Sequence, residues 1–100
     1  MLFRSFLGFS SYKIFGPHCA SLVSHPELLE QIQNDKLAPS TMVVPERFEF
    51  GTLPYEIMAG VSASIDFVAS MDDQATGSRR ERIIKSMNAL EAYEIGRAHV

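Results

Sequence analysis

Residues 9–23 read FSSYKIFGPHCASLV and hold one lysine, Lys13, among apolar and small residues. Tyr12 precedes this lysine, Ile14 and Phe15 follow it, and a Gly-Pro pair then breaks the chain. The pattern favours two short strands joined by a turn, with the lysine at the corner between them. A lysine that only solvates a surface would more often lie among other charges. The position therefore indicates a lysine that is needed for its amine.

The first half of the chain is predicted to hold these two strands and one short helix. The strands are expected over residues 6–11 and 19–24. Because proline is favoured in the first turn of a helix, a helix should begin at Pro26 and run to about Asn34. Residues 35–49 contain two prolines and little periodicity, so an extended connection is expected there.

The second half predicts two amphipathic helices. One should run from about Pro54 to Met71, with Thr52 as a plausible N-cap. The next should follow Ser78, which with Glu81 three residues later has the pattern of a capping box. Apolar residues recur every three or four positions and predict packing faces, at Ile57, Met58, Val61, Ile65 and Val68 and then at Ile83, Ile84, Met87 and Leu90.

Composition excludes several classes of protein. The chain has 100 residues, 46% of them apolar and 21% charged, with a net charge of −3, as expected for one small globular unit. It has no basic stripe that would bind nucleic acid and no apolar run long enough to span a membrane, and we expect no signal peptide. Cys19 is the only cysteine, so neither an internal disulfide nor a cysteine-rich metal site is expected. We predict a reducing compartment, the cytoplasm.

The two ends resemble translated sequencing adapter. Residues 95–100, IGRAHV, are encoded by ATC GGA AGA GCA CAC GTC, and residues 1–5, MLFRS, by GTG CTC TTC CGA TCT read from a GTG start. Both strings resemble the two strands of one widely used short-read adapter. We therefore expect residues 1–5 and 95–100 to be foreign and residues 6–94 to be the natural sequence.

Two motifs carry a resemblance to a known family. The stretch from Phe9 to His18, with YK-x-FGPH, resembles the pyridoxal-phosphate attachment region of class V aminotransferases, in their cysteine desulfurase-like branch. Residues 47–52, RFEFGT, are similar to the RFE-x-GT stretch of the same branch, and the RRER stretch at 79–82 to its continuation. The resemblance covers residues 6–94. It implies an α/β fragment of the large domain of a fold-type I enzyme, leading towards the small domain, from a parent that acts on an amino acid as a homodimer.

The resemblance also assigns roles. Lys13 would form the Schiff base with pyridoxal 5'-phosphate, which needs an amine able to lose its proton near neutrality, and apolar burial promotes that loss. Ser10 would bond the cofactor phosphate, and Thr52 the phosphate held by a neighbouring subunit. Tyr12 stands where the wider class has His, and can donate one hydrogen bond to a phosphate. From the residues alone, the favoured interpretation of Ser10 is a strand-end hydroxyl bonded to backbone, and that of Thr52 is a plain helix cap.

Other residues near the lysine are expected to be structural. Cys19 stands where the wider class favours Gly. Because it is a single cysteine in an apolar strand, it is expected to be a small buried hydrophobe rather than a sulfur-accepting nucleophile. His18, after a proline, is expected to be a turn residue. The resemblance does not separate desulfurase, lyase, epimerase and transaminase, because one cofactor linkage serves all four. The alternative left open is a small, non-catalytic helical module that binds a partner.

Overall fold

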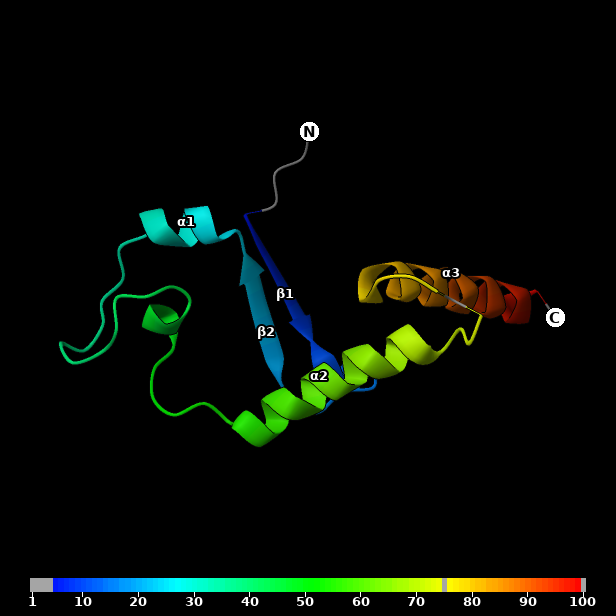
Figure 1. Ribbon diagram of the computed structural model, residues 1–100, viewed down its shortest axis with the longest axis horizontal. Coiled ribbons are helices and arrows are strands. Elements are labelled where there is room, and N and C mark those ends of the chain that lie inside the picture. The colour runs from blue at the N-terminus through cyan, green and yellow to red at the C-terminus, as the bar shows by residue number, and fades with distance from the viewer. Residues whose placement is uncertain (1–4, 75, 100) are drawn as a thin grey trace.

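The computed structural model describes residues 5–74 and 76–99. Two strands, β1 (Phe6–Ser10) and β2 (Ala20–Ser24), form an antiparallel hairpin that pairs Phe6 with Ser24 and Ser10 with Ala20. Three α-helices follow, as α1 (Pro26–Gln31), α2 (Tyr55–Ser70) and α3 (Arg79–Ala98). The predicted order of two strands and three helices is confirmed, and the fold is a mixed α/β arrangement (Figure 1).

The turn between the strands is more ordered than expected. Residues Ser11–Ile14 form a single-turn 3-10 helix, η1, so Lys13 lies on a short helix rather than at a bare corner. The turn ends at Phe15, which adopts the left-handed conformation with φ of 65°. Residues with a side chain adopt that conformation far less readily than glycine does, so contacts with neighbouring residues must stabilise it at Phe15.

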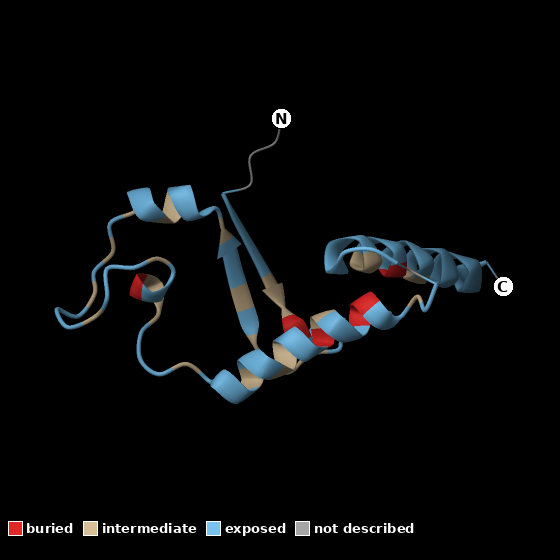
Figure 2. Cartoon of the chain, viewed as in Figure 1, coloured by how far each residue is buried: buried red, intermediate tan, exposed pale blue. Residues whose placement is uncertain are grey.

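The packed elements contact one another in succession rather than surrounding a common core. α2 crosses the end of the hairpin and contacts η1, and α3 lies against α2 (Figure 1). Hydrophobic burial is confined to Val68 and Ala69 of α2 among the described residues (Figure 2). The Cα radius of gyration is 17.4 Å, well above the ~13 Å of a compact domain of this length. The chain thus has little core of its own.

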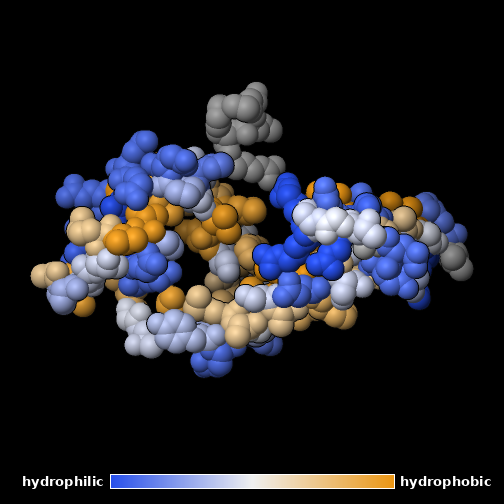
Figure 3. Space-filling model, viewed as in Figure 1, coloured by the Kyte–Doolittle hydropathy of each residue, from blue (hydrophilic) through white to orange (hydrophobic). Residues whose placement is uncertain are grey.

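Many large apolar side chains consequently face solvent. Apolar surface lies over the hairpin and beside it in the space-filling view (Figure 3). Leu7 and Leu22 fall on opposite faces of the hairpin, because Leu7 pairs with Val23 and Leu22 with Gly8, and both are more than half exposed. Strands that are apolar on both faces are typical of sheets covered on both sides.

One predicted helix end and one predicted cap are wrong, whereas α2 (Tyr55–Ser70) agrees with the expected range of about 54–71. α1 ends at Gln31 rather than Asn34, since Ile32 already has extended backbone angles. α2 begins at Tyr55 after Pro54, and no side chain caps it, so Thr52 is not the N-cap. The capping box of Ser78 and Glu81 is confirmed, since Ser78 Oγ accepts from the Glu81 N–H and the Glu81 carboxylate accepts from the Ser78 N–H. α3 runs past Glu94 to Ala98, so the expected boundary at residue 94 is no structural boundary.

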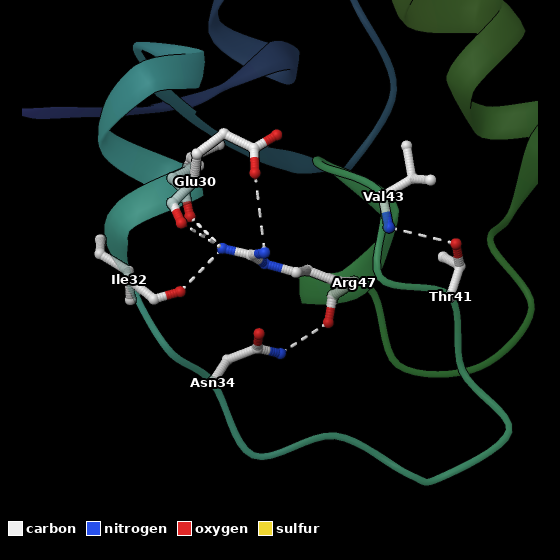
Figure 4. Close-up of polar contacts among 7 residues, drawn as sticks. Glu30, Ile32, Asn34, Thr41, Val43 and Arg47 are labelled. Atoms are coloured by element: carbon white, nitrogen blue, oxygen red, sulfur yellow. Dashed lines mark hydrogen bonds and ion pairs between the residues drawn. The ribbon is translucent and has the colours of Figure 1, made fainter.

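The connection between α1 and α2 is largely irregular, as expected, apart from a 3-10 turn, η2 (Glu46–Phe48). Arg47 of this turn is 8% exposed, and its guanidinium donates to the backbone carbonyls of Leu29, Glu30 and Ile32 at the end of α1 (Figure 4). The Asn34 side chain donates in turn to the Arg47 carbonyl at 2.7 Å. A cation at a helix C-terminus also suits the helix dipole, so Arg47 fastens the connection to α1.

Candidate functional site

The loop that carries Lys13 closes around Ser11. This serine is fully buried, and its hydroxyl proton faces two carbonyls, that of Pro17 at 2.5 Å and that of Cys19 at 2.9 Å. Its N–H donates to the Cys19 carbonyl and its own carbonyl accepts from the Gly16 N–H, each at 2.9 Å. Both ends of the loop therefore meet at one residue, two positions before the lysine.

The same loop is docked tightly on α2. A Cβ at Gly16 would lie 2.8 Å from the Ser11 carbonyl oxygen and 3.0 Å from the Ser64 hydroxyl, so only glycine fits without a shift. One turn earlier on the helix, a Cβ at Gly60 would lie 3.2 Å from Pro17 Cγ. Phe15 and Phe67 add an edge-to-face contact, with ring centroids 5.5 Å apart. Close packing of small residues fixes where the loop sits.

An open hollow of about 680 Å³ lies between this loop and the hairpin. Ser10 and Lys13 both line it. Because directly paired residues share a face of an antiparallel sheet, Gly8 and Leu22 lie on the same face as Ser10 and Ala20. The full lining comprises Gly8, Phe9, Ser10, Lys13, Ile14, Ala20, Ser21 and Leu22. The structure thus brings two of the four predicted site residues to one surface.

The other two predicted residues lie outside that lining. Tyr12 is 50% exposed and its ring stacks on that of His18, with centroids 5.2 Å apart and planes 18° from parallel. The Lys13 Nζ lies 5.9 Å from the centroid of the Tyr12 ring. Thr52 is exposed in the segment between η2 and α2, whereas the lining comes from residues 8–22.

Lys13 is exposed rather than enclosed. Its apolar sequence neighbours do not wrap around it, because Tyr12 and Phe15 are 50% and 62% exposed. The expectation that these neighbours would bury the amine is wrong for this chain. Cys19 is half-buried rather than buried as expected, with its thiol 3.6 Å from the Ala20 carbonyl oxygen, and His18 is exposed.

The groups on the lining fit pyridoxal phosphate in kind. Lys13 offers the amine that this cofactor's aldehyde requires, and Ser10 offers a hydroxyl that can donate to a phosphate. Ile14 and Leu22 provide apolar wall for an aromatic ring. None of the described residues on this lining is acidic, so no carboxylate there repels an anion.

Sequence reasoning missed the two polar residues that organise the molecule, Ser11 and Arg47. Ser11 follows another serine and resembles an ordinary strand-end hydroxyl, and Arg47 resembles a surface cation in a proline-rich connection. A buried arginine is rare unless its donors are used, and here they bind carbonyls 15 to 18 residues away. Such contacts leave no periodic pattern in the sequence.

Comparison with known proteins gives one relative and no family. The chain matches no family model. It is similar to the uncharacterized protein MT3887 of Mycobacterium tuberculosis (strain CDC 1551 / Oshkosh), with 47% identity over 49 residues. The match covers 49% of this chain and 12% of that relative, so the chain spans a small part of the relative's length.

The part of the chain that the structure describes holds neither a membrane-spanning helix nor a cluster of metal ligands. No helix in residues 5–74 or 76–99 is long and apolar enough to cross a membrane. Within the same residues, no three His, Cys, Asp or Glu side chains gather where they could hold a metal ion. The hollow beside Lys13 is the candidate functional site.

Proposed function

We propose that the chain is a segment of a pyridoxal-phosphate-dependent enzyme of the class V aminotransferase type, in the cysteine desulfurase-like branch, and that Lys13 carries the cofactor. The observation that supports this most directly is the position of Lys13 and Ser10 on one lining. The motif around Lys13 supports it independently, since YK-x-FGPH resembles the pyridoxal-phosphate attachment region of that family. The parent would be a fold-type I enzyme of the cytoplasm that works as a homodimer.

Each residue has a definite task in this proposal. Pyridoxal phosphate, when bound, supplies an electron sink for reactions at an amino-acid substrate. Lys13 holds the cofactor through its amine and afterwards moves protons at its Nζ. Ser10 donates its hydroxyl proton to the phosphate, and the Tyr12 phenol is available as a second donor. Thr52, exposed and outside the lining, would serve the phosphate in a neighbouring subunit.

Borohydride trapping tests the assignment on the chain itself. Pyridoxal phosphate is added below one equivalent, borohydride reduces the C=N bond, and mass spectrometry maps the labelled peptide. The chain has three lysines, Lys13, Lys36 and Lys85. We expect label at Lys13 above the other two, because Ser10 offers a phosphate donor on the same lining.

Matched variants complete this experiment. Lys13→Ala should abolish the preferred site, whereas Lys85→Ala, which removes an exposed lysine from α3, should leave the label at Lys13 unchanged. Lys13→Arg should behave like Lys13→Ala, since a guanidinium stays protonated and does not condense with the aldehyde. Label spread equally over the three lysines, or preferred at Lys36 or Lys85, would refute the assignment.

A second candidate is a non-catalytic module that binds a partner through its apolar faces. The exposure of large apolar side chains on both faces of the hairpin favours it as much as it favours a larger parent. Genomic sequence around the natural gene separates the two. Further coding sequence with an aspartate-bearing strand upstream and another domain downstream supports the enzyme, and a native stop codon just after Glu94 supports the module.

A further inference from the structure

We propose that Ser11 is a positioning residue for Lys13. Its buried hydroxyl closes the loop of residues 11–19 and so holds the lysine amine at the hollow beside Ser10. This inference rests on the proposed function, because it concerns how the amine is presented to the cofactor. It goes further by naming a residue that touches neither the hollow nor the cofactor and yet sets the reactivity of the lysine.

The geometry gives Ser11 a bridging position. One hydroxyl proton faces the carbonyls of Pro17 and Cys19, at 2.5 and 2.9 Å, on the far side of the loop. The residue is 0% exposed, so no water competes for that proton. Through its backbone the same residue also contacts Gly16 and Cys19. A cross-link of this kind fixes the arc that carries Lys13.

The hydroxyl acts on the loop more than on the rest of the fold. Each of its two acceptors keeps a backbone donor without it, since the Cys19 carbonyl accepts from the Ser11 N–H and the Pro17 carbonyl from the Cys19 N–H, both at 2.9 Å. No carbonyl is orphaned when the hydroxyl is removed, so the chain should still fold. The loop, however, loses the side-chain bond that spans it beside these backbone bonds, and gains freedom around Lys13.

Greater mobility of the loop around Lys13 should lower the preference of pyridoxal phosphate for Lys13 over the other lysines. Preorganised groups bind a ligand more tightly because less conformational freedom is lost on binding. Here the preorganised groups are the Lys13 amine and the Ser10 hydroxyl, which share one lining. In the trapping reaction the Lys13 nitrogen bonds to the aldehyde carbon and the aldehyde oxygen leaves as water. Borohydride then delivers hydride to that carbon, solvent supplies a proton to nitrogen, and a stable secondary amine remains.

The test compares label at Lys13 with label at Lys85 in the same tube, so that changes in protein concentration cancel, and circular dichroism checks that each variant stays folded. Ser11→Ala should lower the Lys13 to Lys85 ratio about fivefold, which corresponds to ~1 kcal/mol. Ser64→Ala is the matched control, since Ser64 is equally buried and close to Gly16 but donates to the Val61 carbonyl of its own helix. Its ratio should stay within twofold of the original chain.

The outcomes separate the two proposals. A clear preference for Lys13 in the original chain that survives Ser11→Ala overturns the role of Ser11 and leaves the proposed function standing. An equal fall in Ser11→Ala and Ser64→Ala also overturns it, because a general loosening of α2 would then be the cause. Absence of any preference in the original chain overturns both. If Ser11→Ala loses its helical circular dichroism, Ser11→Cys decides instead, since a thiol keeps the shape of the side chain but is a weaker donor, and it must lower the ratio as well.

Discussion

Replacing Arg47 should release the end of α1 and leave the rest of the molecule intact. One terminal nitrogen of its guanidinium faces three carbonyls, those of Leu29, Glu30 and Ile32, at the point where the helix stops. The Glu30 carboxylate lies 3.8 Å away and is 63% exposed, so it contributes little. The side chain itself is 9% exposed, which makes its bonds to the carbonyls the main contribution.

The magnitude follows from how many of these bonds form at once. A terminal guanidinium nitrogen has two protons, so two of the three acceptors are served at a time. Hydrogen bonds with a charged partner stabilise by ~1.5–3 kcal/mol each, and water entering after truncation recovers part of that. The Leu29 carbonyl also keeps the Ile32 N–H at 3.3 Å. We therefore expect Arg47→Ala to cost about 2–4 kcal/mol of local stability.

Hydrogen exchange measures this opening residue by residue. The amides of Leu28, Leu29 and Ile32 donate within α1, and their exchange should accelerate about 30- to 700-fold in Arg47→Ala. Arg47→Lys should fall between, since an ammonium keeps the charge but loses the planar fork. The amides of α2 should change little, because the contacts of α2 are with η1 and α3.

Arg79→Ala is the control for loss of an arginine. Arg79 is 58% exposed and pairs with Asp66 at 3.3 Å on the surface, so its removal should cost less than ~1 kcal/mol. Exchange at the α1 amides within twofold of the original chain in Arg47→Ala would refute the assignment of Arg47 to the helix end. Equal acceleration in α1 and α2 would refute the locality of the effect.

Three further results are expected. Ser78→Ala should cost about 1 kcal/mol, seen as faster exchange in the first turn of α3, because it removes the acceptor for the Glu81 N–H. Gly16→Ala should destabilise by about 1–3 kcal/mol in thermal unfolding, whereas Gly8→Ala should be nearly silent, since a Cβ there meets nothing within 4 Å. The chain should also self-associate, so that its sedimentation coefficient rises with concentration; a sharp, monomeric, cooperative unfolding transition would contradict this.

Local patterns predicted the elements well, because their causes lie within a few residues. Strand alternation before and after a Gly-Pro break placed the hairpin, and the box of Ser78 and Glu81 needs a spacing of only three. The end of α1 could not be predicted in the same way, since Arg47 reaches it from 15 to 18 residues downstream. Thr52 is not the cap because Pro54 occupies the N-cap position and the helix begins at Tyr55.

The candidate site shows the same limit in another form. The sequence placed Lys13 and Ser10 close together, and the hollow that both line is consistent with that. It also placed apolar residues beside Lys13. Neighbouring residues of a 3-10 turn point their side chains in different directions, however, and Tyr12 and Phe15 are half or more exposed. The buried residue of the turn is Ser11, whose importance depends on carbonyls six and eight residues away.

The exposed position of Lys13 sets a requirement for the proposed chemistry. An amine that must be unprotonated near neutrality needs burial or a neighbouring cation, and Lys13 lies open in the described chain. Phe15, two residues after it, and Leu22, on the lining that it shares, are 62% and 72% exposed. A covering surface laid over these two side chains would bury apolar area and enclose the amine in one step. The proposed enzyme therefore requires that cover, and trapping at Lys13 should strengthen when it is present.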